Sequence, residues 1–438
     1  MKSQMSILTV HDFSCLRHVE LDVAPVMVLI GPQGSGKSVT TKLLYFFYDQ
    51  LNRLTQCAEK GVDLSDFKKE AARQFRSWFP PSAWGPGRFN ITFSAGPFSA
   101  RVLRRQSRGT VTDDVAITFS DYFYEHYEAL LSSLSNTRND DLASSSHEIR
   151  KSFDRIWAVR ETFEKKISQD LGSQYVSSQI FVPAGRAFFT SIGRLVAAFD
   201  QGSSIDPVTL RFAKFFAALR DRGGMPWFRS SAERDDRESR ATRKSVMNQL
   251  FGGEIKFERD LEFVETKDGR QVPFSALSSG QQELLPMWLL MDYLSDMPSV
   301  RGGGDLVYIE EPEAHLFPSA QNVLMNYLVG TIVSKRNNRS LILTTHSPYI
   351  LSKLNNFLKA GQLGRNKKFA SDVSKIVNRD CWLTPSRVRA YAIHEGFIEN
   401  LIDADGLIDG AYIDQVSEDV ANEFDHLLNL QFSTQAPV

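Results

Sequence analysis

Residues 26–38 read Val26-Met-Val-Leu-Ile30-Gly31-Pro-Gln-Gly-Ser-Gly-Lys37-Ser38, and this stretch decides the fold. The five apolar residues at its start predict a buried strand, and the apolar, aromatic segment 39–54 predicts a helix. Between them, residues 31–38 match the pattern GxxxxGK[ST] in full, in the strand–loop–helix context that this motif requires. The sequence therefore predicts a phosphate-binding P-loop at the start of an α/β fold.

The residue types of this loop suit a nucleoside triphosphate. Glycines let backbone N–H groups turn toward phosphate oxygens, and the helix N-terminus adds partial positive charge. Lys37 is expected to reach the β- and γ-phosphates, and Ser38 to ligate Mg²⁺. A glycine-rich turn that binds nothing is the alternative, and the flanking strand and helix argue against it. ATP and Mg²⁺ are the predicted cofactors, and the predicted ATP-binding residues are Gly31, Gln33, Gly34, Ser35, Gly36, Lys37 and Ser38.

A second apolar strand, predicted over 306–309, ends in two carboxylates, Glu310 and Glu311. A carboxylate at a strand end beside a P-loop can hold Mg²⁺, usually through water, and the next carboxylate can polarise the attacking water. We assign Glu310 to the metal and Glu311 to catalysis. The alternative is a solvated acidic turn.

Two further segments predict a function only when they are considered together with the other motifs. Leu277-Ser-Ser-Gly-Gln-Gln-Glu283 introduces an apolar helix, where unpaired N–H groups and hydroxyls can meet an anion. In isolation, an ordinary helix cap by Ser278 or Ser279 is the favoured interpretation. His346 follows a strand predicted over 341–345, at the end where α/β sheets bind ligands, although a lone histidine is more often structural than catalytic.

The P-loop, LSSGQQE, LVYIEEPEAHLFP and TTHSPYIL occur in this order, and together they resemble ABC-type ATPases of the RecF, SMC and OLD branch. The resemblance is specific over 1–50 and 250–355. It implies an ABC-type ATPase head, an α/β fold with a mixed and parallel sheet and flanking helices, with an inserted helical subdomain and a small C-terminal extension. Glu310 stands where many relatives carry Asp, which preserves metal binding but changes the reach of the ligand by one methylene.

The resemblance also assigns roles. It implies that LSSGQQE is a signature segment and that its ATP-binding residues are Ser278, Ser279, Gly280 and Gln281. Of these, Ser278 and Gly280 are expected to contact the γ-phosphate of an ATP that a second subunit holds. It implies that His346 is a catalytic switch histidine and that His315 lies in a loop facing the dimer partner. Gln179 is the candidate for a Mg²⁺-sensing glutamine. Arg186, in a PAGR segment, either faces a phosphate or forms a surface salt bridge.

Four segments are predicted along the chain. Residues 1–118 form an N-terminal ATPase lobe with the P-loop, and 119–250 a helical insertion. Residues 251–370 form a C-terminal ATPase lobe with the signature, the second carboxylate-bearing strand and the switch histidine, and 371–438 form a C-terminal extension. Within the insertion, 229–244 is charged and nearly free of apolar residues, which predicts a mobile loop.

Composition limits the partners. The chain has 438 residues, with 51 basic and 52 acidic side chains, so any contact with DNA must come from a local patch. Such a patch is Arg101, Arg104, Arg105 and Arg108, although a charge run is more often a solvated face. Three distant cysteines give neither a zinc pattern nor a disulfide framework. No apolar run is long enough for a membrane span, and we expect a cytoplasmic protein with no membrane partner.

The tail bears on function. Glu395, Asp403 and Asp405 resemble the acidic pattern of TOPRIM nucleases, but they lie too close together in sequence for an intact domain, and a polar loop is the alternative. An ATPase of this branch without its own nuclease resembles the ATPase subunits of anti-phage systems of the PARIS type, with Septu and retron-associated subunits as alternatives. That resemblance implies an ATP-bridged homo-oligomer that regulates an effector nuclease and senses a viral trigger protein.

Two other functional classes remain. One is a DNA-binding repair ATPase of RecF or SMC type, which would bind bare duplex tightly and lose that affinity steeply with salt. The other is the motor of a membrane transporter, which the long segment between the P-loop and the signature disfavours.

Overall fold

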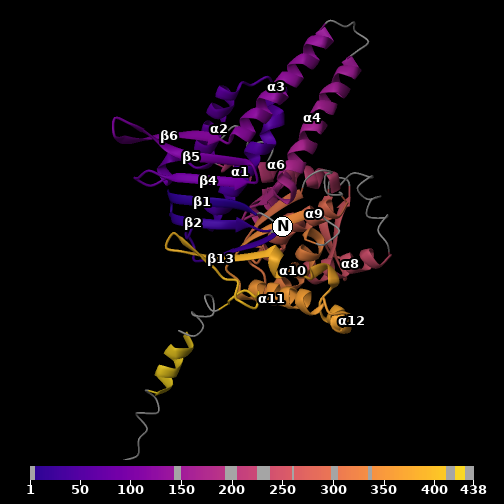
Figure 1. Cartoon of the computed structure of the whole chain (residues 1–438). Coiled ribbons are helices and arrows are strands. Elements are labelled where there is room, and N and C mark those ends of the chain that lie inside the picture. The colour runs from indigo at the N-terminus through magenta and orange to yellow at the C-terminus, as the bar shows by residue number, and fades with distance from the viewer. Residues whose placement is uncertain are drawn as a thin grey trace, which may run out of the picture.

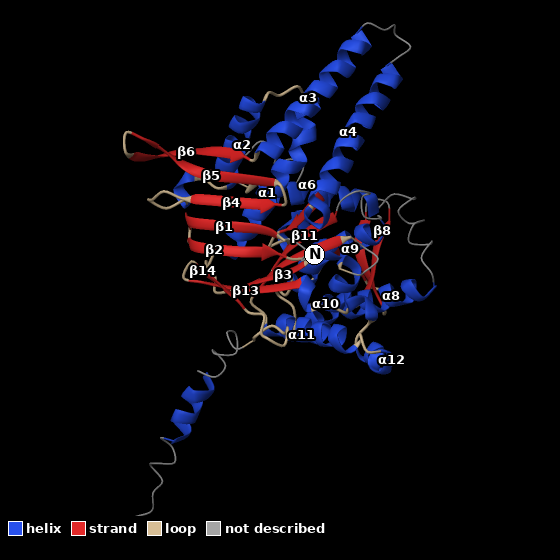
Figure 2. Ribbon diagram, viewed as in Figure 1, coloured by secondary structure: helices blue, strands red, loops and turns tan. Residues whose placement is uncertain are grey.

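A mixed sheet of 11 strands runs through the molecule (Figure 2). The structure, a computed structural model, describes residues 5–142, 149–192, 205–223, 237–258, 261–296, 304–333, 338–410 and 420–429. The strands are β1 (Ser6–Phe13), β2 (Leu16–Val23), β3 (Val26–Ile30), β4 (Asn90–Ala95), β5 (Phe98–Ser107), β6 (Thr110–Phe119), β7 (Val176–Val182), β8 (Gly253–Glu258), β9 (Leu261–Thr266), β10 (Gln271–Pro273), β11 (Gly304–Glu310), β12 (Arg339–Thr345), β13 (Val388–His394) and β14 (Phe397–Asn400). The large sheet has the order β6-β5-β4-β1-β2-β14-β13-β3-β12-β11-β7, and β8 to β10 form a separate small sheet.

Helices flank the large sheet (Figure 1). They are α1 (Lys37–Glu59), α2 (Leu64–Trp78), α3 (Asp121–Leu142), α4 (Ile149–Leu171), α5 (Ala187–Ile192), α6 (Pro207–Gly223), α8 (Arg237–Phe251), α9 (Ser279–Asp296), α10 (Pro318–Ile332), α11 (Pro348–Leu363) and α12 (Lys367–Ile376). The helices α3 and α4 pack on each other and project from the body. The predicted α/β class, with a mixed sheet and flanking helices, is confirmed. In the described part of the chain no helix is both long and apolar enough to cross a bilayer.

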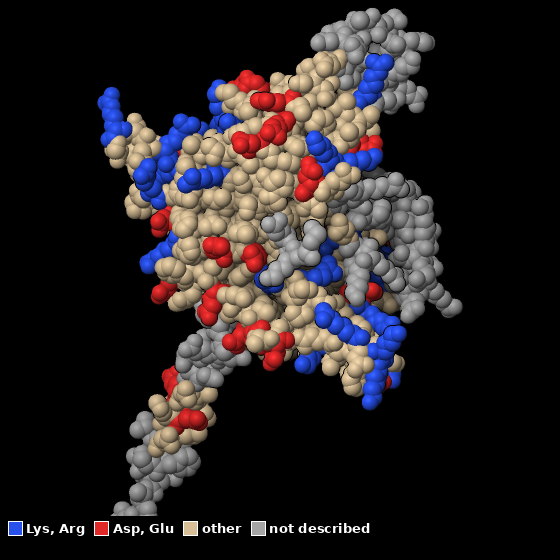
Figure 3. Space-filling view, viewed as in Figure 1, with Lys and Arg blue, Asp and Glu red and all other residues tan. Residues whose placement is uncertain are grey.

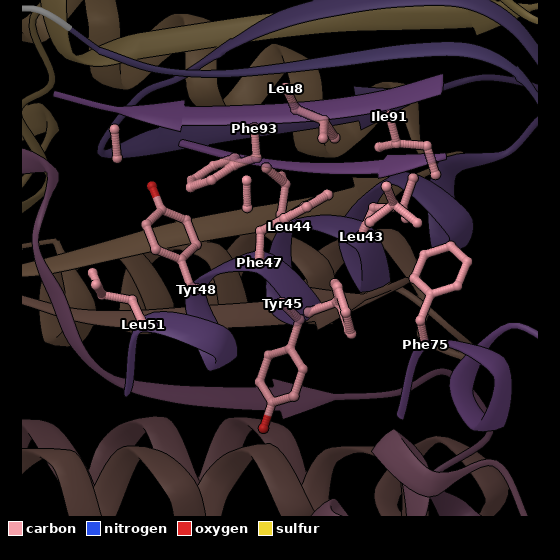
Figure 4. Close-up of a cluster of buried hydrophobic side chains, with 14 of the residues drawn as sticks. Leu8, Leu43, Leu44, Tyr45, Phe47, Tyr48, Leu51, Phe75, Ile91 and Phe93 are labelled. Atoms are coloured by element: carbon pink, nitrogen blue, oxygen red, sulfur yellow. The ribbon is translucent and has the colours of Figure 1, made fainter. Parts of the chain in front are cut away.

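The helix that follows the P-loop is anchored in an aromatic core. One face of the antiparallel half of the sheet covers α1, whose Tyr48 and Phe47 point toward β4 (Figure 4). The Phe47 ring stacks on Phe93, with 5.4 Å between ring centroids. Because large aromatic side chains bury much apolar area, this packing holds the helix, and therefore its N-terminus, in a fixed place.

The parallel half of the sheet brings three predicted motifs to one edge. All five residues of β3 are buried, as the apolar run predicted. In register, Ile30 pairs with Thr345, and Thr344 pairs with Glu310. Because the strands are parallel, their carboxyl ends meet at the same edge of the sheet, where α/β proteins bind ligands.

Two of the predicted segments contribute strands to this sheet. The strand β7 comes from the segment predicted as a helical insertion, and it pairs in parallel with β11. The strand β13 comes from the predicted extension and pairs in parallel with β3. The four segment boundaries stay a prediction, but both strands lie in the large sheet. The sequence did not predict this, because parallel pairing joins residues far apart in sequence and leaves no local signal.

The loop predicted over 229–244 is wrong for its second half, where α8 begins at Arg237; residues 229–236 lie outside the described residues. The helix packs Met247 and Leu250 into the core. Arg243 donates from Nε to Asp292 Oδ1 of α9 over 2.8 Å, so a charge that looked solvated in the sequence is bound to a neighbouring helix. Within the predicted C-terminal extension, residues 420–429 are helical.

Candidate functional site

The P-loop has the backbone that a phosphate cradle needs. Gly31, Gly34 and Gly36 have φ values of 149°, 74° and 109°, which favour glycine. A Cβ added at Gly31 would lie 2.3 Å from the carbonyl oxygen of Ile393 in β13, and one at Gly36 would lie 2.3 Å from a methyl of Leu16. The loop therefore fits only with glycine at both positions, because the neighbouring strands press against it.

Lys37 lies buried within this loop. Its ammonium donates to the backbone oxygen of Gly31 over 2.8 Å and to that of Pro32 over 2.9 Å. Burial lowers the pKa of Lys37, and the nearby carboxylates of Glu311, Glu313 and Glu310 act in the opposite direction. The hydrogen bonds described for this ammonium go to neutral carbonyls. A phosphate oxygen bound in the loop would therefore offer the ammonium a charged acceptor, which makes a stronger hydrogen bond.

Glu310 ends β11 as a buried carboxylate with spare capacity. Its Oε2 accepts from the backbone N–H of Ala184 over 3.3 Å, whereas its Oε1 is buried without a hydrogen-bond partner. Ser38, at the start of α1, has an exposed side chain. A carboxylate oxygen and a hydroxyl are oxygen donors, the type that Mg²⁺ prefers, so the two residues fit the predicted metal.

Glu311 and His346 are brought together. Glu311 has a positive φ of 44°, and its N–H donates to the carbonyl oxygen of Thr344 over 2.9 Å. This turn places Glu311 Oε1 3.4 Å from His346 Nε2. Both side chains are partly exposed, which leaves room for water and for a ligand beside them. The pair at this edge is the one that the sequence assigned to catalysis.

Glu313 supports this pair and was not singled out by the sequence. Its Oε1 accepts from Thr345 Oγ1 over 2.7 Å and from the His346 N–H over 2.6 Å. These bonds tie the loop after β11 to the end of β12. The signal that was present is the third carboxylate in the run Glu310-Glu-Pro-Glu313.

The segment LSSGQQE starts α9, as predicted. Ser278 Oγ and Gln281 Oε1 lie 3.1 Å apart, and Gln281 Oε1 also accepts from the Ser278 N–H, so the two residues cap the helix. A Cβ at Gly280 would lie 2.6 Å from the carbonyl oxygen of His315. The start of α9 is therefore packed against the loop that follows Glu310 and Glu311, with Ser278 and Ser279 exposed.

This segment does not meet the P-loop of its own chain. The side-chain hydrogen bonds described for residues 278–281 stay within the segment or reach the Phe251 carbonyl oxygen. The next residue, Gln282, accepts from Thr190 and Ser191. Across the described ranges, no hydrogen bond or ion pair joins residues 278–281 to residues 31–38. Within one subunit, the two predicted ATP-binding segments are therefore not bonded to each other.

Gln179 is not brought to this site. It pairs with Leu306 in the middle of β7, about 13 Å along the strand from Glu310. Its Nε2 donates to the Tyr45 carbonyl oxygen over 3.2 Å, and its Oε1 accepts from the Tyr308 hydroxyl over 2.9 Å. The assignment of Gln179 to the metal is corrected, because both polar ends of its side chain are bonded elsewhere.

Arg186 has neither of the roles predicted for it. Its side chain is fully buried and joins three elements. Nε donates to the Glu283 carbonyl oxygen over 2.9 Å, Nη1 to that of Glu310 over 2.9 Å and Nη2 to that of Glu311 over 3.2 Å. Burial lowers the pKa of Arg186, opposed chiefly by Glu283. Arg186 thus fixes the start of α9 relative to the end of β11, where Glu310 and Glu311 lie.

The basic cluster is partly absorbed by the fold. Figure 3 shows Lys and Arg side chains over the end of the sheet where β4 to β6 lie. Arg104, however, is only 7% exposed and donates to the Gly85 and Gly87 carbonyl oxygens. Arg105 is paired with Asp114, with 3.4 Å between Nε and Oδ2. Arg101 and the turn residue Arg108 remain exposed.

The acidic tail residues take part in turns. Glu395 lies with Gly396 in the tight turn between β13 and β14, and both have positive φ. Asp403 Oδ1 accepts from the Leu407 N–H over 2.8 Å, which closes a second turn. In the described part of the chain no group of three or more metal-ligating side chains is gathered here or elsewhere.

Comparison with known proteins identifies the family to which most of this chain is similar. Residues 26–352 match the family described as "AAA domain, putative AbiEii toxin, Type IV TA system". No curated protein matches the chain. The SMC head domain from Thermotoga maritima is 14% identical, with 91% of this chain and 98% of that chain covered and a TM-score of 0.35. The SmcHead bound to the C-winged helix domain of ScpA is 10% identical, with 90% and 95% covered and a TM-score of 0.36.

Proposed function

As the chain belongs to this AAA-domain family, described with the AbiEii toxin of type IV toxin–antitoxin systems, we propose that it binds ATP with Mg²⁺ and hydrolyses it. One observation carries the proposal. Lys37, Glu310, Glu311 and His346 lie at the carboxyl ends of strands that are neighbours in the sheet, β3, β12 and β11.

Each side chain at this edge has a role that follows from its chemistry. The N–H groups of the P-loop and Lys37 would bind the phosphates, and Ser38 and Glu310 would hold Mg²⁺, which would neutralise phosphate charge. Glu311 accepts a proton from, or polarises, the attacking water. His346 lies next to Glu311 Oε1 and donates toward the γ-phosphate, and Glu313 holds it in place through its backbone.

We infer that the nucleotide is shared between two copies of the chain, which pair head to tail. The segment 278–281 has exposed serines and no bond to its own P-loop, which supports contact with the γ-phosphate of a partner. Phe317 and Tyr349, which follow the catalytic strands at the starts of α10 and α11, are 77% and 55% exposed. Exposed aromatic residues beside a site are typical of a surface that another subunit covers.

A complementation experiment tests this arrangement. Ser278→Asp keeps a good helix cap but places a carboxylate opposite the γ-phosphate, and Lys37→Ala removes the phosphate ligand. We expect each purified variant to be nearly inactive in a phosphate-release assay, and their mixture to regain turnover. The reason is that a mixed dimer has one site built from two intact halves.

The matched control is Ser278→Asn, which also caps the helix but adds no charge, and it should keep most of the turnover. Two outcomes would refute the shared site. One is that the folded variants stay inactive when mixed. The other is that Ser278→Asp hydrolyses ATP as fast as Ser278→Asn.

We further propose that the ATPase regulates a separate effector nuclease in anti-phage defence. The family description, which names a toxin system, and the acidic tail residues folded into turns support a partner that performs the toxic step. Co-expression with a nuclease encoded beside it should yield a stable, non-toxic complex that comes apart when a phage protein is added. Purification of the two proteins apart, with the nuclease toxic throughout, would contradict this role.

A DNA-binding repair ATPase stays the alternative. The exposed Arg101 and Arg108 favour it, whereas the internal bonds of Arg104 weaken it. Tight binding of bare duplex that falls steeply with salt, in the absence of any nuclease partner, would decide for this alternative.

A further inference from the structure

A cavity lies at the edge of the large sheet that is opposite to the P-loop edge. It has a volume of about 320 Å³ and is lined by residues that include Pro25, Val176, Leu306 and Ser340. These residues belong to the starts of β7, β11 and β12 and to the turn before β3. Because the same strands end at the P-loop edge, the cavity and the nucleotide site lie at opposite ends of one sheet.

Gln174 lines this cavity with an unpaired amide. Its side chain is 7% exposed, and neither its Nε2 nor its Oε1 has a hydrogen-bond partner. A buried amide without partners is costly, and such groups in native proteins are few. The amide can donate and accept at once, so it suits a ligand with a hydrogen-bonding edge.

Arg387 lines the same cavity and supplies a positive charge. Its guanidinium is half-buried, and the only cause that shifts its pKa, downward, is burial. In the described part of the chain no ion pair or hydrogen bond is made by this guanidinium, unlike that of Arg389 two residues later, which lies 3.8 Å from Asp22. A half-buried arginine without an acidic partner is suited to an anion.

The remaining wall is apolar or carries neutral hydroxyls. Tyr48 donates to Ser6 Oγ over 3.0 Å, and burial raises the pKa of Tyr48 to about 12, so its phenol stays neutral. Val23, Ala24 and Val176 complete the apolar part. A concave, mostly apolar space with few polar groups that converge on it is the usual form of a small-molecule site.

We propose that this cavity binds a small organic anion, whose acidic group pairs with Arg387, whose hydrogen-bonding edge meets Gln174, and whose apolar body fills the space between them. The site is independent of the nucleotide site, because it shares no lining residue with the P-loop or with Glu310, Glu311 and His346.

The test uses 8-anilinonaphthalene-1-sulfonate, an organic anion whose fluorescence rises in an apolar site. The full chain is titrated with saturating ATP and Mg²⁺ present, so that the nucleotide site does not take up the dye. We expect a saturable signal, weakened about tenfold or more by Arg387→Gln, because a charged hydrogen bond is lost. Arg389→Gln is the matched control and should bind the dye as the unmodified chain does.

Gln174→Leu provides a second readout. We expect it to raise the Tm, because it removes a buried amide that has no partner, and to weaken dye binding. A lower Tm would mean that the fold itself holds the amide, and this would overturn its role. Dye binding that does not saturate, or that is the same in Arg387→Gln and Arg389→Gln, would overturn the site.

Discussion

We expect Glu311→Gln to lower ATP turnover by about 100-fold or more, and we expect ATP still to join the subunits. The amide has the size of the carboxylate but cannot accept a proton from water, and general-base contributions are of this order. The substitution leaves Lys37 and Glu310 in place, so ATP and Mg²⁺ still bind. Phosphate release measures turnover. Size-exclusion chromatography with and without ATP measures the size of the assembly, and the Glu311→Gln variant should elute as a larger species with ATP than without it.

Glu313→Gln is the matched control for this result. A glutamine Oε1 can still accept from Thr345 Oγ1 and the His346 N–H, so the loop should keep its geometry and most of its turnover. Full hydrolysis by Glu311→Gln, or an equal loss in both variants, would remove Glu311 from its assigned role.

We expect Arg186→Met to destabilise the chain by about 3–5 kcal/mol, because it leaves the buried Glu283 carboxylate, 3.5 Å from Arg186 Nε, and several backbone oxygens without their charged partner. The carbonyls of Glu310 and Glu311 are among these oxygens, so the change should also lower turnover in the fraction that stays folded. Urea unfolding followed by fluorescence measures the free energy of unfolding.

Arg105→Met is the control for a surface arginine, since Arg105 is 58% exposed in its pair with Asp114 and such pairs contribute about 1 kcal/mol at most. Arg186→Lys should recover little, because an ammonium cannot match the planar guanidinium, which donates to the carbonyl oxygens of Pro183, Glu283, Glu310 and Glu311. Equal unfolding free energies for Arg186→Met and Arg105→Met would contradict this structural role of Arg186.

The sequence predicts those parts of the fold that depend on local patterns. The apolar run 26–30, the P-loop and the helix after it are all found where the pattern puts them. The carboxylates of Glu310 and Glu311 reach the predicted edge because a parallel strand fixes where its end lies. The charged stretch after Arg237 was misjudged because its helix depends on Asp292 and Trp288 of another helix.

Residues whose role depends on distant neighbours could not be placed in this way. Gln179 and Arg186 are close in sequence, yet Gln179 bonds to Tyr45 of α1 and Tyr308 of β11, whereas Arg186 joins the start of α9 to the end of β11. The charge of an arginine does not tell whether it is buried. Only the packing of α9 against the end of β11 decides that Arg186 is enclosed.

The place of β13 beside β3 has a consequence for biosynthesis. A ribosome completes β3 and the P-loop long before it makes Ile393 of β13, the neighbour that presses on Gly31. Until β12 and then β13 have been made, the nascent chain presents unpaired edges of β3, which are templates for wrong strand partners. The P-loop therefore reaches its packed form only after β13 has been made, and a chain that stalls before β13 is a candidate for chaperones.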